Sequence, residues 1–295
     1  MKLAFVILNY GTFKETTECV QSIKKHIDIL EEEYHIVIVD NGSSDDSGVE
    51  LKKEYQQEKN IDVILNPENI GFAKGNNIGI RYVNEKYEPE FIVVLNSDTE
   101  LFQDDLYEKI STEYKHSHFG MLGPMMLTGD GRCNDSPWKP IEIAAVERRI
   151  QELKTEKKRI LNRTIYIKKI IDKIKEKIGV ANWQDYLHEH LEFWKYNTDA
   201  ELQGAFLVFS KEIFNYIDGF DSRTFLYYEE QLLYLHAKRS GLPIVYDPRI
   251  SVYHKDGCSS KKSRGRSREK MLFFNNCNLE SLQYVLEELK KDNKK

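Results

Sequence analysis

The sequence has few cysteines and no long hydrophobic run, and both absences narrow its class. Its four cysteines, Cys19, Cys133, Cys258 and Cys277, lie far apart and form no CxxC pair. Such spacing suggests neither a zinc site nor a disulfide framework, and it fits a reducing cytosol. No segment approaches the roughly 18 consecutive apolar residues that a membrane span needs. The first apolar run is too short for a signal peptide and lacks a small-residue cleavage site, so we expect a buried strand there.

The chain also lacks an excess of basic charge. Its formal net charge is -5, which argues against a general nucleic-acid binder. Hydrophobic residues make up 40 % and charged residues 31 % of the 295 residues, as in ordinary soluble globular proteins. This length suits one large domain with an insertion, or two small domains.

Strand and helix signals alternate over the first hundred residues. Short apolar runs are separated by segments whose apolar residues recur at helical spacing. This alternation predicts an α/β fold with right-handed crossovers and a mainly parallel sheet flanked by helices, whose ligands bind beyond the carboxyl ends of the strands. The predicted strands are Leu3–Leu8, Ile36–Val39, Asp62–Leu65 and Phe91–Leu95, and the predicted helices are Thr16–Leu30 and about 49–57.

Polar clusters follow two of these strands at their carboxyl ends. Asn96-Ser97-Asp98 follows the fourth strand, so Asp98 is placed to hold Mg²⁺ or Mn²⁺ against a pyrophosphate, because these ions prefer oxygen ligands. Asp40 ends the second strand and is a candidate to accept hydrogen bonds from a ribose or a nucleobase. The alternative interpretations are an N-cap for Asp98 and an Asx turn for Asp40.

A glycine-rich segment, residues 66–79, follows the third strand and opens a helix. Its three glycines, Gly71, Gly75 and Gly79, suit a close backbone approach to a ligand, with an ordinary loop and helix start as the alternative. The segment has neither the GxGxxG fingerprint nor the GK[ST] of a P-loop, which counts against Rossmann dehydrogenases and P-loop NTPases.

Two further candidates lie in the last third of the chain. Glu229 and Glu230 follow an aromatic run, and one of them is a candidate general base whose pKa is raised by partial burial and by its neighbour's charge. The alternative is the exposed first turn of a helix, where acids favour the positive end of the dipole. His254 follows a strand and is a candidate metal ligand or phosphate contact, or a structural histidine.

Residues 138–198 are predicted as a helical insertion. Apolar residues from Ile141 to Ile178 recur mostly three or four apart, which predicts one or two amphipathic helices. Between Glu147 and Lys177 there are twelve Lys or Arg against five Asp or Glu. The alternatives are a peripheral contact with anionic membrane, packing on the catalytic domain, and packing on a second subunit in a homodimer. We favour packing, because the apolar face lacks Trp and Phe.

The C-terminal part begins with a basic stretch at 261–268, followed by a predicted helix from about Glu269 to Lys291. The basic stretch is interpreted either as a loop that closes over a donor diphosphate or as a solvated loop.

Together these segments resemble the family 2 glycosyltransferases with a GT-A fold, and within them the rhamnosyltransferase-like branch that builds bacterial surface polysaccharides. The resemblance covers about residues 1–130 and 200–280 and omits the insertion. Eight modest motifs occur in the family's order, and their order makes the match specific. They are Ile7–Tyr10, Val39–Ser43, Asn69–Asn77, Leu95–Thr99, Gly204–Phe206, Gly219–Asp221, Tyr228–Glu230 and His254.

The resemblance implies a role for each matching position. Asp98 is the surviving acid of a DxD-like metal motif, and His254 completes the metal or diphosphate site. Glu230 stands where the family usually has an aspartate base, with Glu229 as second choice. Gly204 and Ala205 line the acceptor side. The implied donor-binding residues are Asn9, Asp40, Asn41, Asn69, Gly71, Lys74, Asn77, Asn96 and Ser97.

The resemblance also implies the domain organisation and the activity. Residues 1–260 form a GT-A catalytic domain that the insertion interrupts, and 261–295 form the basic loop and the C-terminal helix. The activity is metal-dependent, inverting transfer of a sugar from dTDP-rhamnose or a UDP-hexose to a saccharide or lipid-linked acceptor. The implied location is the cytoplasm or the inner face of the cell membrane. The altered Glu-Glu pair and Asn96 keep a non-catalytic nucleotide-sugar-binding or scaffold protein as the alternative.

Overall fold

The computed structural model describes residues 1–128, 137–165, 190–255 and 267–293. Within them one mixed sheet runs in the order β3-β2-β1-β4-β7-β6-β8-β5. The predicted α/β fold is therefore confirmed. The strands are β1 (Leu3–Asn9), β2 (Tyr34–Asp40), β3 (Ile61–Leu65), β4 (Phe91–Asn96), β5 (Thr99–Glu100), β6 (Met121–Leu127), β7 (Phe206–Ser210) and β8 (Ile244–His254).

The four strands predicted from the first hundred residues pair in parallel. β1 lies between β2 and β4, and β3 extends the sheet beyond β2. Residues at the carboxyl ends face each other across the sheet, with Asn9 opposite Asp40 and Leu8 opposite Asn96. All four strands therefore end at one edge, which we call the carboxyl edge.

The second half of the sheet contains the direction changes. β7 runs antiparallel to both β4 and β6, so its first residue, Phe206, lies at the carboxyl edge opposite Leu95. β8 is parallel to β6 and ends at this same edge with His254. The short β5 pairs antiparallel with the end of β8, which places Thr99 opposite His254. The topology therefore brings the ends of β4 and β8 together.

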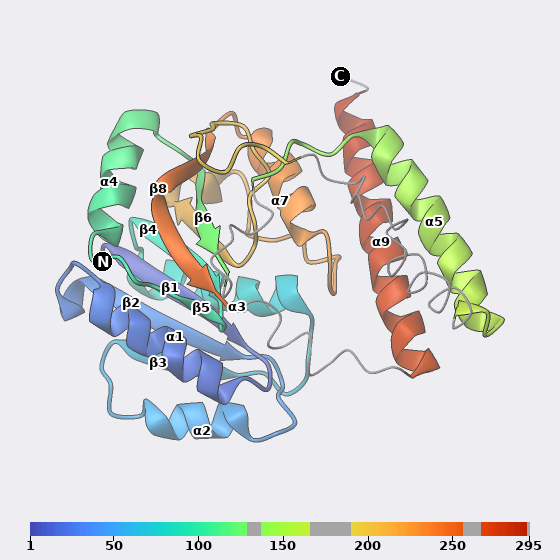
Figure 1. The fold of residues 1–295 in the computed structure, drawn as a ribbon. Helices are drawn as coiled ribbons and strands as arrows, with labels where there is room; N and C mark the ends of the chain where they lie inside the picture. Colours follow the sequence, from blue (N-terminus) through green and yellow to red (C-terminus); the bar gives the residue numbers. More distant parts are fainter. Residues whose placement is uncertain (129–136, 166–189, 256–266, 294–295) are drawn as a thin grey trace.

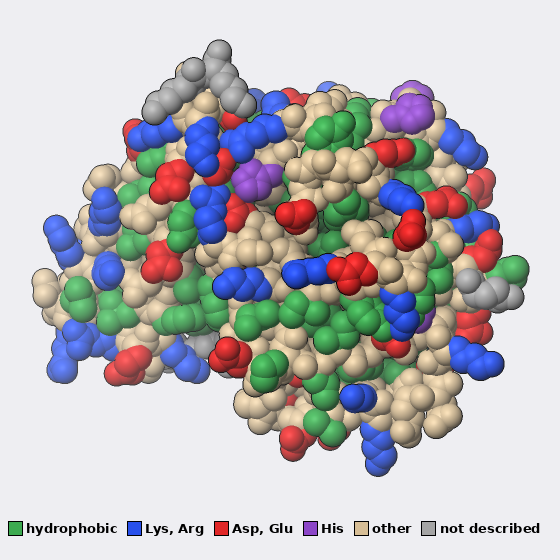
Figure 2. All heavy atoms as spheres, turned by 180° about the vertical axis from the view of Figure 1, so that it is seen from behind, with side chains coloured by type: hydrophobic (Ala, Val, Ile, Leu, Met, Phe, Trp, Pro, Cys, Tyr) green, Lys and Arg blue, Asp and Glu red, His purple; other side chains and the backbone are tan. Residues whose placement is uncertain are grey.

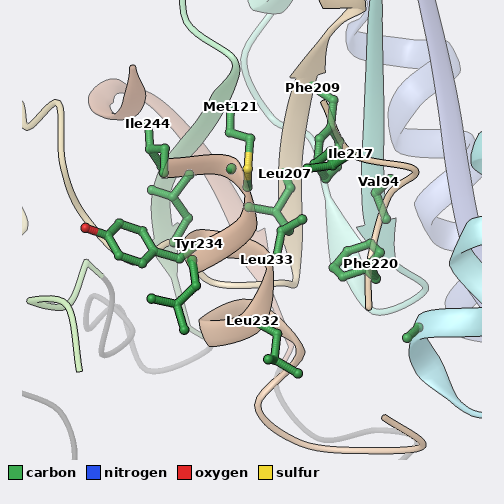
Figure 3. Packing of buried hydrophobic residues seen from close by; sticks show 14 of the residues in the cluster. Val94, Met121, Leu207, Phe209, Ile217, Phe220, Leu232, Leu233, Tyr234 and Ile244 are labelled. Carbon is green, nitrogen blue, oxygen red and sulfur yellow. The ribbon is translucent and has the colours of Figure 1, made fainter. Parts of the chain in front are cut away.

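Helices cover both faces of the sheet (Figure 1). The apolar residues of α1 (Phe13–His26), α2 (Ser47–Glu54) and α4 (Leu106–Ser117) pack in one core cluster. Those of α3 (Phe72–Tyr87) and α7 (Glu229–Lys238) pack in the other. Figure 3 shows Leu233 of α7 beside Leu207 of β7. This packing holds the first turn of α7, which carries both candidate acids, at a fixed place relative to β7.

The helix α1 ends four residues before the predicted boundary. Ile27 already has an extended backbone, with φ -77° and ψ 134°. The carboxylate of Asp28 accepts hydrogen bonds from the N–H groups of Tyr107 and Glu108, at 2.8 and 3.0 Å, in the first turn of α4. This cap draws the chain away from the helix and leaves Leu30 exposed. A short 3₁₀ helix, Glu31–Glu33, follows directly after Leu30. The other 3₁₀ helix is Lys211–Asn215.

A pair of long helices stands beside α7 (Figure 1). In the predicted insertion, α5 (Ile143–Leu161) buries Val146, Ile150 and Leu153. It packs on the C-terminal helix α9 (Arg268–Asp292), whose Asn275 amide donates to the Leu153 carbonyl at 3.2 Å. The rest of the predicted insertion from 166 to 189, and most of the basic stretch, lie outside the described residues.

The surface charge and the helix composition were compared with what nucleic-acid or membrane contact would require. On the face shown in Figure 2, basic and acidic side chains are interspersed around a band of hydrophobic ones. None of the helices in the described ranges combines the length and the apolar character that spanning a bilayer requires.

Candidate active site

The donor-side network, formed by Asn9, Asp40 and the turn after Asp40, joins the ends of β1 and β2. The Asn9 amide donates to the Asp40 carboxylate at 2.6 Å, and the Ser43 hydroxyl donates to this carboxylate at 2.5 Å. The side-chain oxygen of Asn9 accepts hydrogen bonds from the hydroxyls of Thr12 and Thr16, both at 2.9 Å. The predicted residues Asn9 and Asp40 therefore meet, and both are buried in hydrogen bonds. The Asx-turn interpretation of Asp40 holds as well, since the Ser43 N–H also donates to it at 3.1 Å.

Asn41 fixes the loop that precedes α3. Its amide nitrogen donates to the Asn69 side chain and to the Gly71 carbonyl, both at 3.1 Å. Its side-chain oxygen accepts from Asn66 and from the Ile70 N–H, both at 3.2 Å. Asn41, Asn69 and Gly71, which the resemblance implies as donor-binding residues, thus lie together and hydrogen-bond to one another.

The glycines of residues 66–79 allow close contacts between protein elements. Gly71 has φ +90°, and a Cβ there would lie 2.6 Å from the Phe225 carbonyl oxygen. At Gly75 and Gly79 a Cβ would lie 2.6 Å from Leu8 and 2.3 Å from Val6, so these glycines let α3 lie directly on β1. These close contacts are made within the protein, so the predicted approach to a ligand stays a prediction; Lys74 is exposed in the first turn of the helix.

Asn77 joins α3 to a distant turn. Its amide nitrogen donates to the Phe220 carbonyl at 2.7 Å and to the Ser222 hydroxyl at 3.1 Å. Its oxygen accepts from the Phe220 N–H at 2.8 Å. The side chain is buried and serves the Gly219–Asp221 motif, so a donor contact for Asn77 stays a prediction from the resemblance.

Asp98 and His254 meet where β4 and β8 end. The Asp98 carboxylate lies 3.2 Å from His254 Nε2, and both side chains are about 6 % exposed. The other ring nitrogen, Nδ1, is buried without a hydrogen-bond partner among the described residues. Next to Asp98, the Ser97 hydroxyl lies 2.9 Å from that of Thr12, which ties the pair to the donor-side network.

The pair can supply two ligands to a hard divalent cation. No group of three or more His, Cys, Asp or Glu side chains able to hold a metal occurs in the described part of the chain. Mg²⁺ commonly takes one or two protein carboxylates and completes its shell with phosphate oxygens and water. His254 Nε2 beside the buried Asp98 carboxylate fits such a partial donor set, with the diphosphate of a substrate as the source of further oxygens.

Gly204 and Ala205 link the two halves of the site. The Ala205 carbonyl accepts from the Asn96 N–H and from the Thr99 hydroxyl, both at 3.0 Å. The Gly204 N–H donates to Glu230 Oε1 at 3.3 Å. A Cβ on Gly204 would lie 2.7 Å from that oxygen, so only glycine leaves room for the acid. The predicted acceptor-side residues therefore lie between the Asp98 loop and the predicted base.

The turn of residues 227–230, which we call the acid turn, is strained and poor in compensating charge. Tyr227 and Tyr228 both have left-handed backbones, with φ of 75° and 63°, which is unfavourable for non-glycine residues. Glu229 is 4 % exposed, and one of its carboxylate oxygens has no hydrogen-bond partner among the described residues. Burial and the charge of Glu230 raise the pKa of Glu229 to about 8, and burial also raises the pKa of the half-buried Glu230.

A third buried acid, Glu201, stands beside this pair and was missed by the sequence analysis. Its carboxylate accepts from the Ile141 N–H at 2.7 Å and from the Gln231 amide at 3.1 Å. Burial raises the pKa of Glu201 to about 7, and the charge of Glu230 adds to this shift. The sequence signal was an acid just before Gln203-Gly204-Ala205, but nothing in the spacing indicated that it would be buried against α7.

A large cavity lies elsewhere in the described part of the chain. It has a volume of about 1060 Å³ and is lined by Asn77, Arg223, His236 and Glu288 among others. Glu288 is buried in ion pairs there, at 2.9 Å from Arg223 and 2.7 Å from Arg239. Because none of Asp98, His254 or Glu230 lines it, this cavity is not the candidate site.

Comparison with known proteins gives the same assignment as the motifs. The model of the family described as Glycosyl transferase family 2 matches residues 4–217, well over half of the chain.

Two named relatives are similar in sequence. The low-salt glycan biosynthesis hexosyltransferase Agl10 of Haloferax volcanii is 29 % identical over 136 residues, which is 46 % of this chain and 40 % of that protein. The rhamnosyltransferase WbbL of Escherichia coli K12 is 24 % identical over 240 residues, covering 80 % of this chain and 78 % of the relative. This chain thus matches less than half the length of the first relative and most of the second.

Solved structures share the fold. S. aureus TarS 1–349 in complex with UDP-GlcNAc superposes with a TM-score of 0.57 at 16 % identity, covering 98 % of this chain and 71 % of that one. The same protein in complex with UDP gives a TM-score of 0.55, also at 16 % identity, over 98 % and 70 % of the two chains. At this identity the likeness establishes the architecture alone.

Proposed function

Since the chain belongs to glycosyl transferase family 2, we propose that it transfers a sugar from a nucleotide-diphosphate donor to an acceptor hydroxyl with inversion at the anomeric carbon. The observation that carries the proposal is the backbone at Gly204 and Ala205. It contacts the Asp98 loop on one side and Glu230 on the other. A diphosphate site and a general base thus flank one short segment, the arrangement that a single in-line displacement needs.

Glu230 is proposed as the general base. It is half-buried and borders Gly204, whereas Glu229 is enclosed beneath it. Two adjacent buried carboxylates do not both ionise readily, and the deeper one holds the proton they share. Glu229 then stays neutral and Glu230 carries the negative charge. Glu230 takes the proton from the acceptor hydroxyl as that oxygen bonds to the anomeric carbon, and the bond from that carbon to the diphosphate oxygen breaks.

Asp98 and His254 are proposed to hold Mg²⁺ or Mn²⁺, with Asn96 and Ser97 next to them on the donor side. A divalent cation, when bound, supplies the positive charge that a departing diphosphate requires. The part played by the chain itself is to keep the two ligands in contact at the ends of β4 and β8, since Thr99 pairs with His254 directly beside Asp98.

The proposed donor is dTDP-rhamnose or a UDP-hexose. The names of the relatives support this choice: one is a rhamnosyltransferase, one a hexosyltransferase, and the TarS structures contain UDP or UDP-GlcNAc. The proposed acceptor is a saccharide or lipid-linked saccharide of bacterial surface polysaccharide synthesis. The apolar face of α5 is already covered by α9. A membrane contact by this helix would therefore be electrostatic, through exposed cations such as Arg148 and Lys158.

The proposal is tested by comparing two carboxylate–histidine pairs of the same chain. Asp98→Ala removes the buried pair, and Asp104→Ala removes the surface pair with His26, in which the aspartate is 82 % exposed. The wild type and both variants are incubated with UDP-, dTDP- and GDP-sugars, with and without Mn²⁺. Donor binding is measured as a thermal shift, and turnover as release of the nucleoside diphosphate.

We expect the wild type and Asp104→Ala to bind one donor and release its nucleoside diphosphate. Asp98→Ala should lose at least 100-fold of this turnover, about 2.7 kcal/mol of transition-state stabilisation. Equal turnover in all three proteins contradicts the site. Donor binding without any turnover by the wild type supports the non-catalytic alternative instead.

A further inference from the structure

We infer that Lys255 is a positioning residue that holds the end of β8, and with it His254, against Asp98. The inference rests on the proposed metal role of Asp98 and His254, and it concerns how the chain keeps these two ligands together. Lys255 immediately follows His254 at the carboxyl edge, and nothing in the family motifs singles it out.

Lys255 is fixed at both its backbone and its side chain. Its N–H donates to the Asp98 carbonyl oxygen at 3.0 Å. Its ammonium group forms close ion pairs with Glu18 of α1 and Glu100 of β5. One side chain therefore joins three elements at the point where the two proposed ligands meet.

The end of β8 pairs with β6, but the ladder that aligns it with Asp98 is short. β5 is only two residues long, so the ladder that aligns Asp98 with His254 consists of the pairs Thr99–His254 and Glu100–Tyr253. Metal-binding histidines are usually oriented by a hydrogen bond from their second ring nitrogen. His254 Nδ1 has no such partner among the described residues. The orientation of the imidazole then depends on the backbone of β8, which Lys255 ties down.

Lys255 is not itself placed as a diphosphate contact. Its ammonium group lies between two carboxylates, which compensate its charge and use its donors. Together with Asp98 the cluster of Glu18, Glu100 and Lys255 carries a net negative charge, which attracts a cation and repels a phosphate. The lysine thus belongs to the frame of the cation site.

The test uses Mn²⁺ and UDP or dTDP with the full chain. Lys255→Met keeps most of the apolar stem but removes the ammonium group. Lys255→Arg keeps the charge. The matched control is Lys14→Met, because Lys14 pairs with the same Glu18 at 3.6 Å from an 80 % exposed position. Mn²⁺ affinity is measured by calorimetry or by the electron paramagnetic resonance signal of free Mn²⁺, and Asp98→Ala is included as the variant that lacks a ligand.

A positioning role for Lys255 and a purely electrostatic role predict opposite changes in the Mn²⁺ affinity of Lys255→Met. Removal of the Lys255 charge leaves the negative charges of Glu18 and Glu100 less compensated near the site, which by charge alone tightens Mn²⁺ binding. Loss of positioning weakens it, by about 10-fold or more as for other outer partners of metal ligands. We therefore expect weaker binding in Lys255→Met, near-normal binding in Lys255→Arg, and unchanged binding in Lys14→Met.

Equal or tighter Mn²⁺ binding by Lys255→Met overturns the inference. Should that variant fail to fold, Lys255→Gln removes the ammonium group but keeps a polar side chain, and it is expected to weaken Mn²⁺ binding in the same direction. Failure of the proposed function looks different: Asp98→Ala and the wild type would then bind Mn²⁺ equally. Loss of binding in Asp98→Ala together with normal binding in Lys255→Met sinks only the positioning role.

Discussion

The donor-side network and the acid turn lie at the same edge of the sheet but are built in opposite ways. In the donor-side network each side chain has several partners; Asn9 alone contacts Asp40, Ser47, Thr12 and Thr16. In the acid turn two buried carboxyl groups stand side by side with raised pKa values, after two residues with left-handed backbones.

The difference indicates that the donor-side network is a rigid scaffold and that the acid turn is the part suited to proton transfer. A saturated network of buried hydrogen bonds is rigid and holds a binding edge in one shape. Buried acids with raised pKa values cost stability but are suited to accept a proton near neutral pH. The fold therefore places its most ordered hydrogen-bond network at the ends of β1 and β2, and its strained backbone in the acid turn.

The largest effect expected from this comparison is on turnover. Glu230→Gln keeps the shape of the proposed base but cannot accept a proton, so we expect turnover to fall by about 10²–10⁴-fold. Donor affinity should stay the same, because the contact between Gly204 and Glu230 Oε1 can persist with the amide. Steady-state turnover and donor thermal shifts measure the two quantities separately.

Glu229→Gln is the matched comparison for Glu230→Gln. It replaces the acid that we place in the neutral state, so its turnover should fall much less. A larger loss in Glu229→Gln than in Glu230→Gln would exchange the roles of the two acids.

The sequence predicted the arrangement of the strands better than the hydrogen bonds between distant side chains. Strands with polar ends are local patterns, and the positions of Asp40 and Asn96 at the ends of the two strands that flank β1 followed from them. Asn77 and Phe220 are 143 residues apart, and no periodicity indicates that their groups pair. Glu201 escaped notice for the same reason, since its burial depends on Ile141 and Gln231 from other segments. What spacing does not show is which polar groups the protein itself already satisfies.

A smaller effect, on stability, is expected at Asn77. Asn77→Ala leaves the backbone groups of Phe220 without partners in a buried place, which costs about 2 kcal/mol. Urea unfolding measures this loss, and Asn84→Ala, at a half-buried position on the same helix, is the control. Donor affinity of the folded variant should be unchanged. A variant of normal stability with weak donor binding would instead favour the donor role that the resemblance implies.

The smallest effect expected is a pH-dependent gain in stability at Glu229. Its pKa is about 8 in the folded protein against a usual 4.5, because of burial and the neighbouring Glu230. Between these values the folded state keeps a proton that the unfolded state has lost. The free energy of unfolding therefore falls as the pH rises from about 4.5 through about 8. Glu229→Gln cannot titrate and lacks this loss.

We accordingly expect Glu229→Gln to melt about 2–4 °C above the wild type at pH 9, the shift that about 1 kcal/mol produces in a domain of this size. At pH 5 the two proteins should melt within about 1 °C of each other, because the glutamate is then protonated in the fold. Glu54→Gln, at an exposed position at the end of α2, is the control and should shift neither value. The test is to measure melting curves of the three proteins at both pH values. An equal gain in melting temperature at pH 5 and pH 9 would assign the effect to packing and would contradict the raised pKa of Glu229.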